Sequence, residues 1–143
     1  DAGNVVIEGR EVSIKSPADA LAQGVRVIYQ ELSVLENLTV AANVFLGREP
    51  KKGPFLNEAK MVEDTRAILA RLGSSIDPTG LVGRLSLAER QLVEIARALS
   101  MQVKILVLDE PTSSLTVEET AQLLNLIRDL RKDGVGILYI SHR

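Results

Sequence analysis

The sequence predicts an α/β fold with a mostly parallel β-sheet, and three segments near the C-terminal end carry this prediction. Residues 105–108 form a wholly apolar run that leads directly into Asp109 and Glu110. Residues 117–132 place apolar side chains at helical spacing, and residues 135–140 are again almost continuously apolar. A strand, a helix and a second buried strand in this order form a βαβ unit, whose strands are parallel. The predicted apolar face of the helix comprises Val117, Ala121, Leu124, Ile127 and Leu130.

The N-terminal elements follow from alternation and from capping residues. Residues 4–14 alternate in polarity around Glu8-Gly9-Arg10, which predicts a hairpin. Ser16 before Pro17 is a favourable helix start, so a short helix is expected to about Gln23. Residues 25–29 then predict a strand that ends at Gln30.

The middle of the chain predicts helices. A helical stretch follows Gln30, in which Thr39 can cap residues 40–46 before Gly47 stops the helix. Residues 49–54 contain two prolines and a glycine and predict an exposed loop.

Two longer helices complete this region. Asn57 caps the first, which Gly73 ends, and the second runs over about 87–100 after a loop at 74–84. We therefore expect two lobes. Residues 1–30 and 101–143 would form part of a sheet lobe. Residues 31–100 would form an inserted helical lobe that contains the motif at residues 85–91.

Composition narrows the classes of function. The chain has 143 residues, enough for one domain, with 45% hydrophobic but only 3% aromatic residues, so aliphatic side chains must fill the core. The net charge of −2 and the lack of a basic stripe argue against a nucleic-acid partner. The absence of cysteine excludes disulfides and thiolate metal sites. The apolar runs are too short for a membrane span, and we expect the chain to be truncated at both ends.

The paired acids at the end of the apolar run suggest phosphate chemistry. Asp109 and Glu110 would lie at the carboxyl edge of the sheet, where open α/β folds bind ligands. One carboxylate can hold a hydrated Mg²⁺ and the other can orient a water, as in a nucleotide hydrolase. The alternative is a strand end that happens to be acidic, because short motifs have many false positives.

Two further motifs have a structural and a functional reading. Ser86 with Glu89, and Thr116 with Glu119, have the spacing of capping boxes at helix starts. Arg90 with Glu94 and Glu94 with Arg97 are expected to be supporting charge pairs. A capped helix start also offers N–H groups and a positive dipole end to a phosphate, so both readings of Ser86 remain open.

Two single residues are ambiguous alone. His142 follows a buried strand, and its imidazole could simply be solvated there. Gln30 likewise only ends a strand.

The order of these features resembles the nucleotide-binding domain of ABC-type ATPases over essentially the whole chain. Gln30 matches the Q-loop and residues 85–91, LSLAERQ, match the signature. Residues 105–110 match Walker B, residues 113–116 match the D-loop, and His142 matches the switch histidine. The sequence is most similar to the N-terminal half of the two-domain ATPases of bacterial monosaccharide importers of the ribose, xylose and galactose type. The resemblance implies a P-loop NTPase-like fold with an inserted helical subdomain.

The resemblance also implies roles for individual residues. ATP and Mg²⁺ would be the cofactors, with Asp109 and Gln30 at the metal and Ser86 facing ATP held by another domain. Glu110 would polarise the attacking water, and His142 would contact the γ-phosphate as a second catalytic residue. The partners would be a second ABC ATPase domain in head-to-tail arrangement, a membrane permease and, indirectly, a sugar-binding protein. The protein would lie peripherally on the cytoplasmic face of the bacterial inner membrane.

The sequence departs from the family pattern in three places. Leu87 and Ala88 replace both glycines of LSGGQ, Glu89 replaces its glutamine, and Thr116 replaces the usual aspartate of the D-loop. No G-x-x-x-x-G-K-[ST] phosphate loop (Walker A) occurs, and we expect it upstream of Asp1.

Two functions therefore stay open: the ATPase domain of a sugar importer, whose isolated 143 residues would be inactive, or a non-catalytic fragment or regulatory half that only binds partner domains. A DNA-repair ATPase is disfavoured, because the stretch between Gln30 and Ser86 is too short for the long coiled coils of those proteins.

Overall fold

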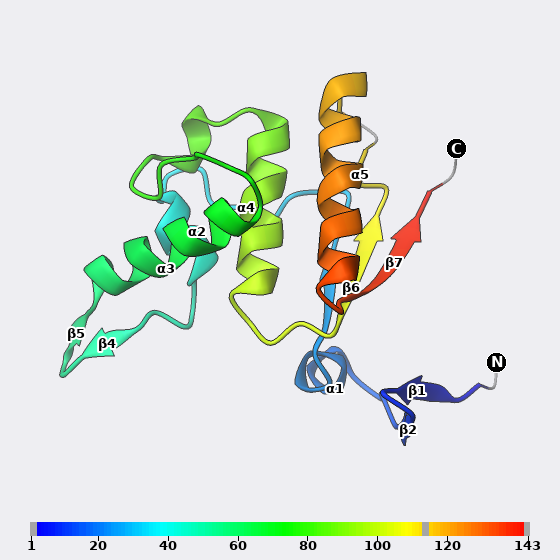
Figure 1. The fold of residues 1–143 in the computed structure, drawn as a ribbon. Helices are drawn as coiled ribbons and strands as arrows, with labels where there is room; N and C mark the ends of the chain where they lie inside the picture. The colour runs from blue at the N-terminus through cyan, green and yellow to red at the C-terminus, as the bar shows by residue number, and fades with distance from the viewer. Residues whose placement is uncertain (1–2, 113–114, 142–143) are drawn as a thin grey trace.

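A computed structural model describes residues 3–112 and 115–141 of the chain. A three-stranded parallel sheet lies at its centre, flanked by helices and by two small hairpins (Figure 1). The sheet contains β3 (Val25–Ile28), β6 (Ile105–Asp109) and β7 (Gly136–Ile140), in the order β3-β6-β7. Both strand pairs are parallel, which confirms the predicted βαβ arrangement. Among the described residues, no helix is both long and apolar enough to cross a membrane.

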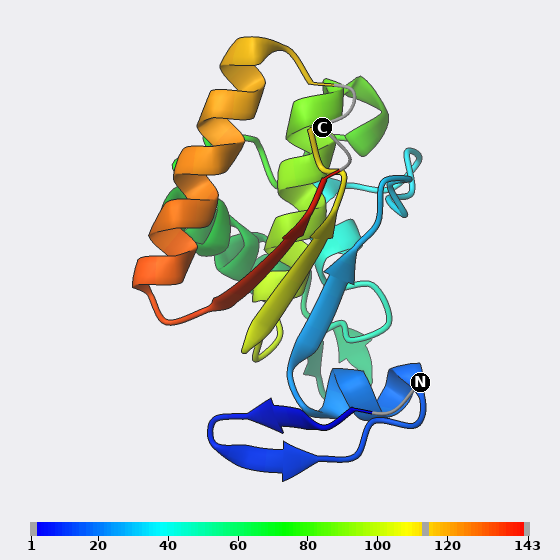
Figure 2. The same ribbon diagram turned by 90° about the vertical axis from the view of Figure 1, so that its right-hand side faces the viewer.

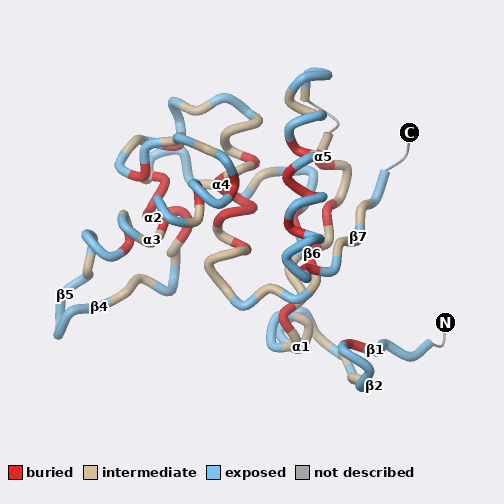
Figure 3. The backbone as a smooth tube through the Cα atoms, viewed as in Figure 1, coloured by how far each residue is buried: buried red, intermediate tan, exposed pale blue. Residues whose placement is uncertain are grey.

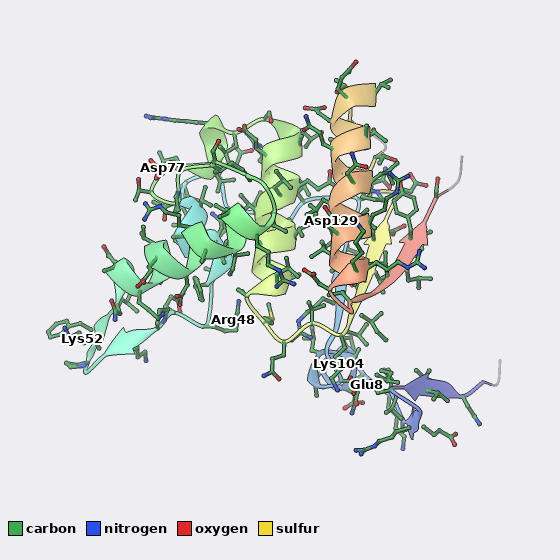
Figure 4. The ribbon with its side chains drawn as sticks, in the orientation of Figure 1. Glu8, Arg48, Lys52, Asp77, Lys104 and Asp129 are labelled. Atoms are coloured by element: carbon green, nitrogen blue, oxygen red, sulfur yellow. The ribbon has the colours of Figure 1, made fainter. Side chains whose placement is uncertain are left out.

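The N-terminal elements match the prediction. β1 (Val5–Ile7) and β2 (Arg10–Val12) pair antiparallel, and Glu8 and Gly9 both have positive φ in the turn between them. α1 (Pro17–Ala22) begins after Ser16, whose hydroxyl accepts a hydrogen bond from the Asp19 N–H. Lys104, just before β6, forms a 2.6 Å ion pair with Glu8, so the hairpin is tied to the start of the central strand (Figure 4).

Gly24 shows why the turn into β3 requires a glycine. Its φ is +80°, and a Cβ atom there would lie 2.9 Å from the Lys104 Cγ and 3.1 Å from the Gln102 carbonyl oxygen. The close approach allows the Lys104 N–H to donate to the Gly24 carbonyl oxygen at 2.8 Å. This contact brings β3 alongside β6 although the two strands are far apart in sequence.

The region between β3 and β6 is helical, with two differences from the prediction. It contains α2 (Val40–Val44), α3 (Glu58–Arg71), the short 3₁₀ helix η1 (Val82–Arg84) and α4 (Leu87–Leu99). Residues 31–38 do not form a helix; instead, the carbonyl groups of Glu36 and Leu38 accept hydrogen bonds from the N–H groups of Gly83 and Val82 in η1. The predicted loop at 49–54 includes a small hairpin of β4 (Lys51–Lys52) and β5 (Phe55–Leu56), with the turn at Gly53 at positive φ.

Helix α5 (Val117–Lys132) has the predicted bounds, but only Ile127 and Leu130 of its predicted apolar face are buried. Leu123, Leu126, Ile127 and Leu130 are buried, whereas Val117 is 82% exposed. The predicted positions, spaced by four and then three residues, drift around the helix because one turn takes 3.6 residues. The buried residues keep to one stripe at i, i+3, i+4 and i+7.

The core lies between one face of the sheet and the helices. Leu106 and Leu108 of β6 are fully buried against residues of α4 and α5, which lie on the same side of the three strands (Figures 2 and 3). The same cluster continues through Val40, Val44 and Leu69 into α2 and α3. The opposite face of the sheet is open: Val27 and Leu138, which flank Val107 in register, are 41% and 54% exposed.

Candidate functional site

The carboxyl ends of the parallel strands bring the predicted site residues to one edge of the sheet. Ile28 of β3 is paired with Leu108 of β6, so Gln30 and Glu110 each lie two residues beyond the same pair. Asp109 is the last residue of β6 and is paired with Ile140 of β7. Figure 2 shows the three strands running in the same direction toward this edge. The prediction that Asp109 and Glu110 lie at the carboxyl edge of the sheet is therefore correct, and the structure places Gln30 at the same edge.

Glu110 turns the chain out of the sheet. Its φ of 45° lies in the left-handed region of backbone conformation, which residues other than glycine and asparagine rarely adopt. Its backbone N–H donates to the Ile140 carbonyl oxygen at 3.0 Å, and the buried Pro111 follows. The neighbouring strand β7 thus holds the backbone of the residue that directly follows β6. Non-glycine residues in this region of φ and ψ cluster at functional sites, where the surrounding structure stabilises them.

A small pocket joins Gln30 to Glu110. Its volume is about 40 Å³, and residues from three parts of the chain line it. Gln30 and Leu32 follow β3, Glu110 and Pro111 follow β6, and Leu87 and Gln91 belong to the first turns of α4. Leu115 completes the lining. The structure therefore brings two sequence-predicted site residues together with the start of the signature helix.

Asp109 and Ser86 do not line this pocket, but each is the neighbour in sequence of a residue that does. Asp109 is half-buried at the end of β6. Its position suits a magnesium ion, because Mg²⁺ in nucleotide sites takes one or two carboxylates and completes its octahedron with water and phosphate oxygens. Among residues 3–112 and 115–141, no three His, Cys, Asp or Glu side chains cluster in a way that could hold a metal ion.

The start of α4 is a complete capping box. The Ser86 hydroxyl accepts from the Glu89 N–H at 3.3 Å, and the Glu89 carboxylate accepts from the Ser86 N–H at 2.8 Å. The structural reading of the motif is thus confirmed, and the same holds for Thr116 and Glu119 at the start of α5. Two of the N–H groups that a phosphate could use at the start of α4 already have acceptors.

Arg90 does not pair with Glu94 as predicted. Its guanidinium instead pairs with the Glu36 carboxylate and donates to the carbonyl oxygens of Leu85 at 3.1 Å and Gly83 at 3.2 Å. Glu94 faces the opposite way, into the protein, where it lies 4.0 Å from Arg97. The predicted Glu94–Arg97 pair is therefore present. The Arg90–Glu94 pair fails because Arg90 instead contacts two carbonyl groups just before α4 and the Glu36 carboxylate from the loop after β3.

Sequence reasoning missed three buried polar residues near the site: Asn43, Gln91 and Glu94. Each is at most 9% exposed and hydrogen-bonds to a loop that leads from the pocket. The available signal was their polarity at helical positions otherwise occupied by core residues, as in Val93-Glu94-Ile95-Ala96.

A larger cleft, of about 690 Å³, opens between α4, α5 and the end of α3. It is lined by Glu89 and by residues on the surface of α5, but not by Gln30, Asp109 or Glu110. We therefore place the candidate site at the smaller pocket, where the chemically suited residues converge. His142 and Ser113 lie outside the described residues, so the predicted roles of the switch histidine and of the first D-loop position remain predictions.

Three comparisons relate the chain to known proteins. A family model described as "ABC transporter" matches residues 1–113. The chain is 50% identical over 141 residues to the ribose import ATP-binding protein RbsA of Yersinia pestis. The match covers 99% of this chain but 28% of that protein, so the chain spans just over a quarter of the length of this curated relative.

The fold has close counterparts among solved structures. The ADP conformation of MJ1267, an ATP-binding cassette of an ABC transporter, superposes with a TM-score of 0.82 at 30% identity. The match covers all of this chain and 60% of that one. A nucleotide-free ATP-binding cassette from an ABC transporter gives a TM-score of 0.81 at 29% identity, with the same coverage.

Proposed function

Because this chain belongs to the ABC transporter family, we propose that it forms part of an ATPase domain that couples ATP hydrolysis to monosaccharide uptake. The observation that supports this best is the pocket shared by Gln30, Glu110 and the first turns of α4. In a head-to-tail pair of such domains, Gln30 and Glu110 would act on the nucleotide of this domain, whereas the start of α4 beside them would face the nucleotide of the partner domain. The sugar class is suggested by the printed name of the Yersinia relative, a ribose import protein.

The proposed chemistry assigns one task to each residue. Mg²⁺ bound with ATP would neutralise charge on the phosphate oxygens, and Asp109 would hold it through water. Glu110 would polarise the attacking water, since its carboxylate borders the pocket. Gln30, at the end of the neighbouring strand β3, would sense the γ-phosphate and metal. His142 would contact the γ-phosphate, and Ser86 would face ATP held by the partner domain.

The proposed partners follow from the same assignment. They are a second ABC ATPase domain, a membrane permease that contacts the Gln30 loop and, through the permease, a sugar-binding protein. The location would be the cytoplasmic face of the bacterial inner membrane.

The second candidate is a non-catalytic segment that only binds partner domains. It is supported by the absence of a G-x-x-x-x-G-K-[ST] loop from the 143 residues. That loop supplies the N–H groups, the lysine and the metal-binding hydroxyl that grip the phosphates.

Transport by an intact importer that contains this segment separates the two candidates. Asp109→Asn should reduce sugar uptake and ATP hydrolysis together, because the metal would lose its carboxylate. Asp129→Asn, which changes an exposed carboxylate of α5 that does not line the small pocket, is the matched control and should leave both rates near wild type. Equal rates for Asp109→Asn and wild type would exclude the catalytic proposal and favour the binding-only segment.

A further inference from the structure

Buried polar side chains in this protein have an uneven distribution that points to a positioning role. Among the described residues, only Asn43, Thr65, Gln91 and Glu94 are polar or charged and buried. Burying such groups costs free energy unless they are hydrogen-bonded, so each calls for a physical reason. Three of the four bind the two loops that lead away from the pocket.

Glu94 holds the loop after Gln30. Its carboxylate accepts hydrogen bonds from both the backbone N–H and the hydroxyl of Ser33, each at 2.7 Å. Arg97 lies 4.0 Å from the same carboxylate and donates to the Ser33 hydroxyl at 3.3 Å. Ser33 directly follows Leu32, which lines the pocket with Gln30. Hydrogen bonds to a charged acceptor are stronger than those between neutral groups, so this anchor is a firm one.

Asn43 of α2 holds the same loop two residues later. Its side-chain oxygen accepts from the Leu35 N–H at 2.7 Å, and its side-chain nitrogen donates to the Leu35 carbonyl oxygen at 2.9 Å. Both backbone groups of Leu35 are thus bound by one fully buried side chain. Residues 33–35 are therefore held in place by hydrogen bonds to α4 and α2.

Gln91 holds the other loop. Its side-chain nitrogen donates to the Pro111 carbonyl oxygen at 2.7 Å, directly after Glu110. Gln91 and Glu94 are three residues apart, so they lie on one face of α4. The same helix face therefore contacts the loop of Gln30 through Glu94 and the loop of Glu110 through Gln91.

We propose that Gln91 and Glu94 are positioning residues that set the distance between Gln30 and Glu110 through α4. Because one rigid helix is hydrogen-bonded to both loops, Gln30 and Glu110 keep a fixed separation although their strands are far apart in sequence. This inference about loop placement rests on the hydrogen bonds alone. Its consequence for catalysis rests on the proposed ATPase function.

Hydrogen exchange and NMR on the 143-residue chain test the loop placement directly. In Glu94→Ala the Ser33 amide should exchange roughly ten to a hundred times faster, the factor expected from losing a hydrogen bond to a charged group. Glu94→Gln keeps one acceptor oxygen and should restore part of the protection, which a general loss of packing would not allow. Glu118→Ala removes an exposed carboxylate from α5 and should leave Ser33 unchanged. For the other loop, Gln91→Leu should shift the Glu110 and Thr112 amide resonances, whereas Glu118→Ala should not.

An unchanged Ser33 exchange rate in both Glu94 variants would overturn the proposal, as would unchanged Glu110 and Thr112 resonances in Gln91→Leu. If Glu94→Ala does not fold, Glu94→Gln and Ser33→Ala give the same test with smaller changes. In an intact ATPase that contains the segment, Glu94→Ala should lower kcat while the Kd for ATP stays near wild type. An inactive wild-type ATPase would count against the proposed function but leave the exchange result valid.

Discussion

The Glu110 N–H donates to the Ile140 carbonyl oxygen at 3.0 Å, immediately beyond the last paired residues of β6 and β7. The bond stabilises a left-handed backbone at a glutamate, with φ of 45°. It also joins the chain just after Asp109 to the end of β7 at Ile140. The conformation of the proposed water-polarising residue is thus set by the strand next to it.

Replacing this carboxylate tests its proposed role. In an intact transporter that contains the segment, Glu110→Gln should slow hydrolysis at this domain's site by about 10²- to 10⁴-fold, the usual contribution of a general base. ATP-driven closure should persist, because binding depends mainly on the phosphate loop and the metal. Glu118→Gln on α5 is the control. Single-turnover hydrolysis at the wild-type rate in Glu110→Gln would show that another group polarises the water.

The isolated 143-residue chain should not hydrolyse ATP and should bind it weakly. The reason is the missing phosphate loop, for which no motif in the sequence substitutes. Phosphate release and nucleotide titration on the purified chain provide the measurements. Robust turnover that disappears in Glu110→Gln would contradict this expectation.

The altered signature should slow the composite site that it completes. Glu89 already places a carboxylate at the start of α4, bound to the Ser86 N–H, and Arg90 is held by Glu36 and two carbonyl oxygens. An anion at a helix start is stabilised by about 0.3–1 kcal/mol. Because the Glu89 carboxylate already occupies this position, a phosphate in the transition state should lose a similar amount of stabilisation there.

Rebuilding LSGGQ tests this effect. The triple change Leu87→Gly, Ala88→Gly and Glu89→Gln in the intact protein should raise single-site turnover by roughly two- to fivefold, which is that energy expressed as a rate. Glu119→Gln, which alters the equivalent capping box of α5, is the matched control. If turnover at the site completed by this signature does not rise, the altered signature is not the cause of slow hydrolysis there.

The open face of the sheet should make the isolated chain self-associate. Parallel sheets are usually covered on both faces, whereas Val27, Leu138 and Ile140 are 41%, 54% and 37% exposed here. Sedimentation should show dimers or larger species at micromolar concentration, and Leu138→Lys should reduce them. Val117→Lys, at an exposed position on α5, should not. A monodisperse wild-type monomer with a high, cooperative Tm would count heavily against this prediction.

Acid should destabilise the protein in part through Asp77 and Asp19. Hydrogen bonds from the Thr79 N–H and hydroxyl lower the pKa of Asp77 below its ordinary 3.8, and the Lys15 N–H and the Ser16 side chain do the same for the pKa of Asp19. A lowered pKa in the folded state means that the stabilisation is complete above the ordinary pKa and is lost as pH falls through the folded pKa. Urea unfolding from neutral pH to about pH 3 should therefore show a smaller loss of stability in Asp77→Asn than in the wild type. Identical pH dependence of the two proteins would rule out a contribution from Asp77.

Local sequence was sufficient for elements whose signals are local. Ser16, Thr39, Asn57, Ser86 and Thr116 each cap the helix that they were predicted to cap, because a side-chain oxygen satisfies N–H groups only two or three residues away. The βαβ unit was predictable for a similar reason, since chain connection fixes the strand direction.

Features that depend on distant partners were not predictable in this way. The buried face of α5 is set by the side of the helix that meets the sheet, and the partner of Arg90 is set by a loop from another part of the chain. The roles of Gln91 and Glu94 likewise depend on Pro111 and Ser33, which only the folded chain places beside α4.

The sequence by itself therefore determined the identity and order of the motifs, the direction of the strands, and the placement of Asp109 and Glu110 at the carboxyl edge of the sheet. Only the tertiary structure decided that Gln30 and Glu110 share a pocket and that one face of α4 holds both of their loops. The physical reason is range: caps and strand periodicity act over a few residues, whereas a hydrogen bond such as Glu94 to Ser33 exists only after segments far apart in the chain have packed together.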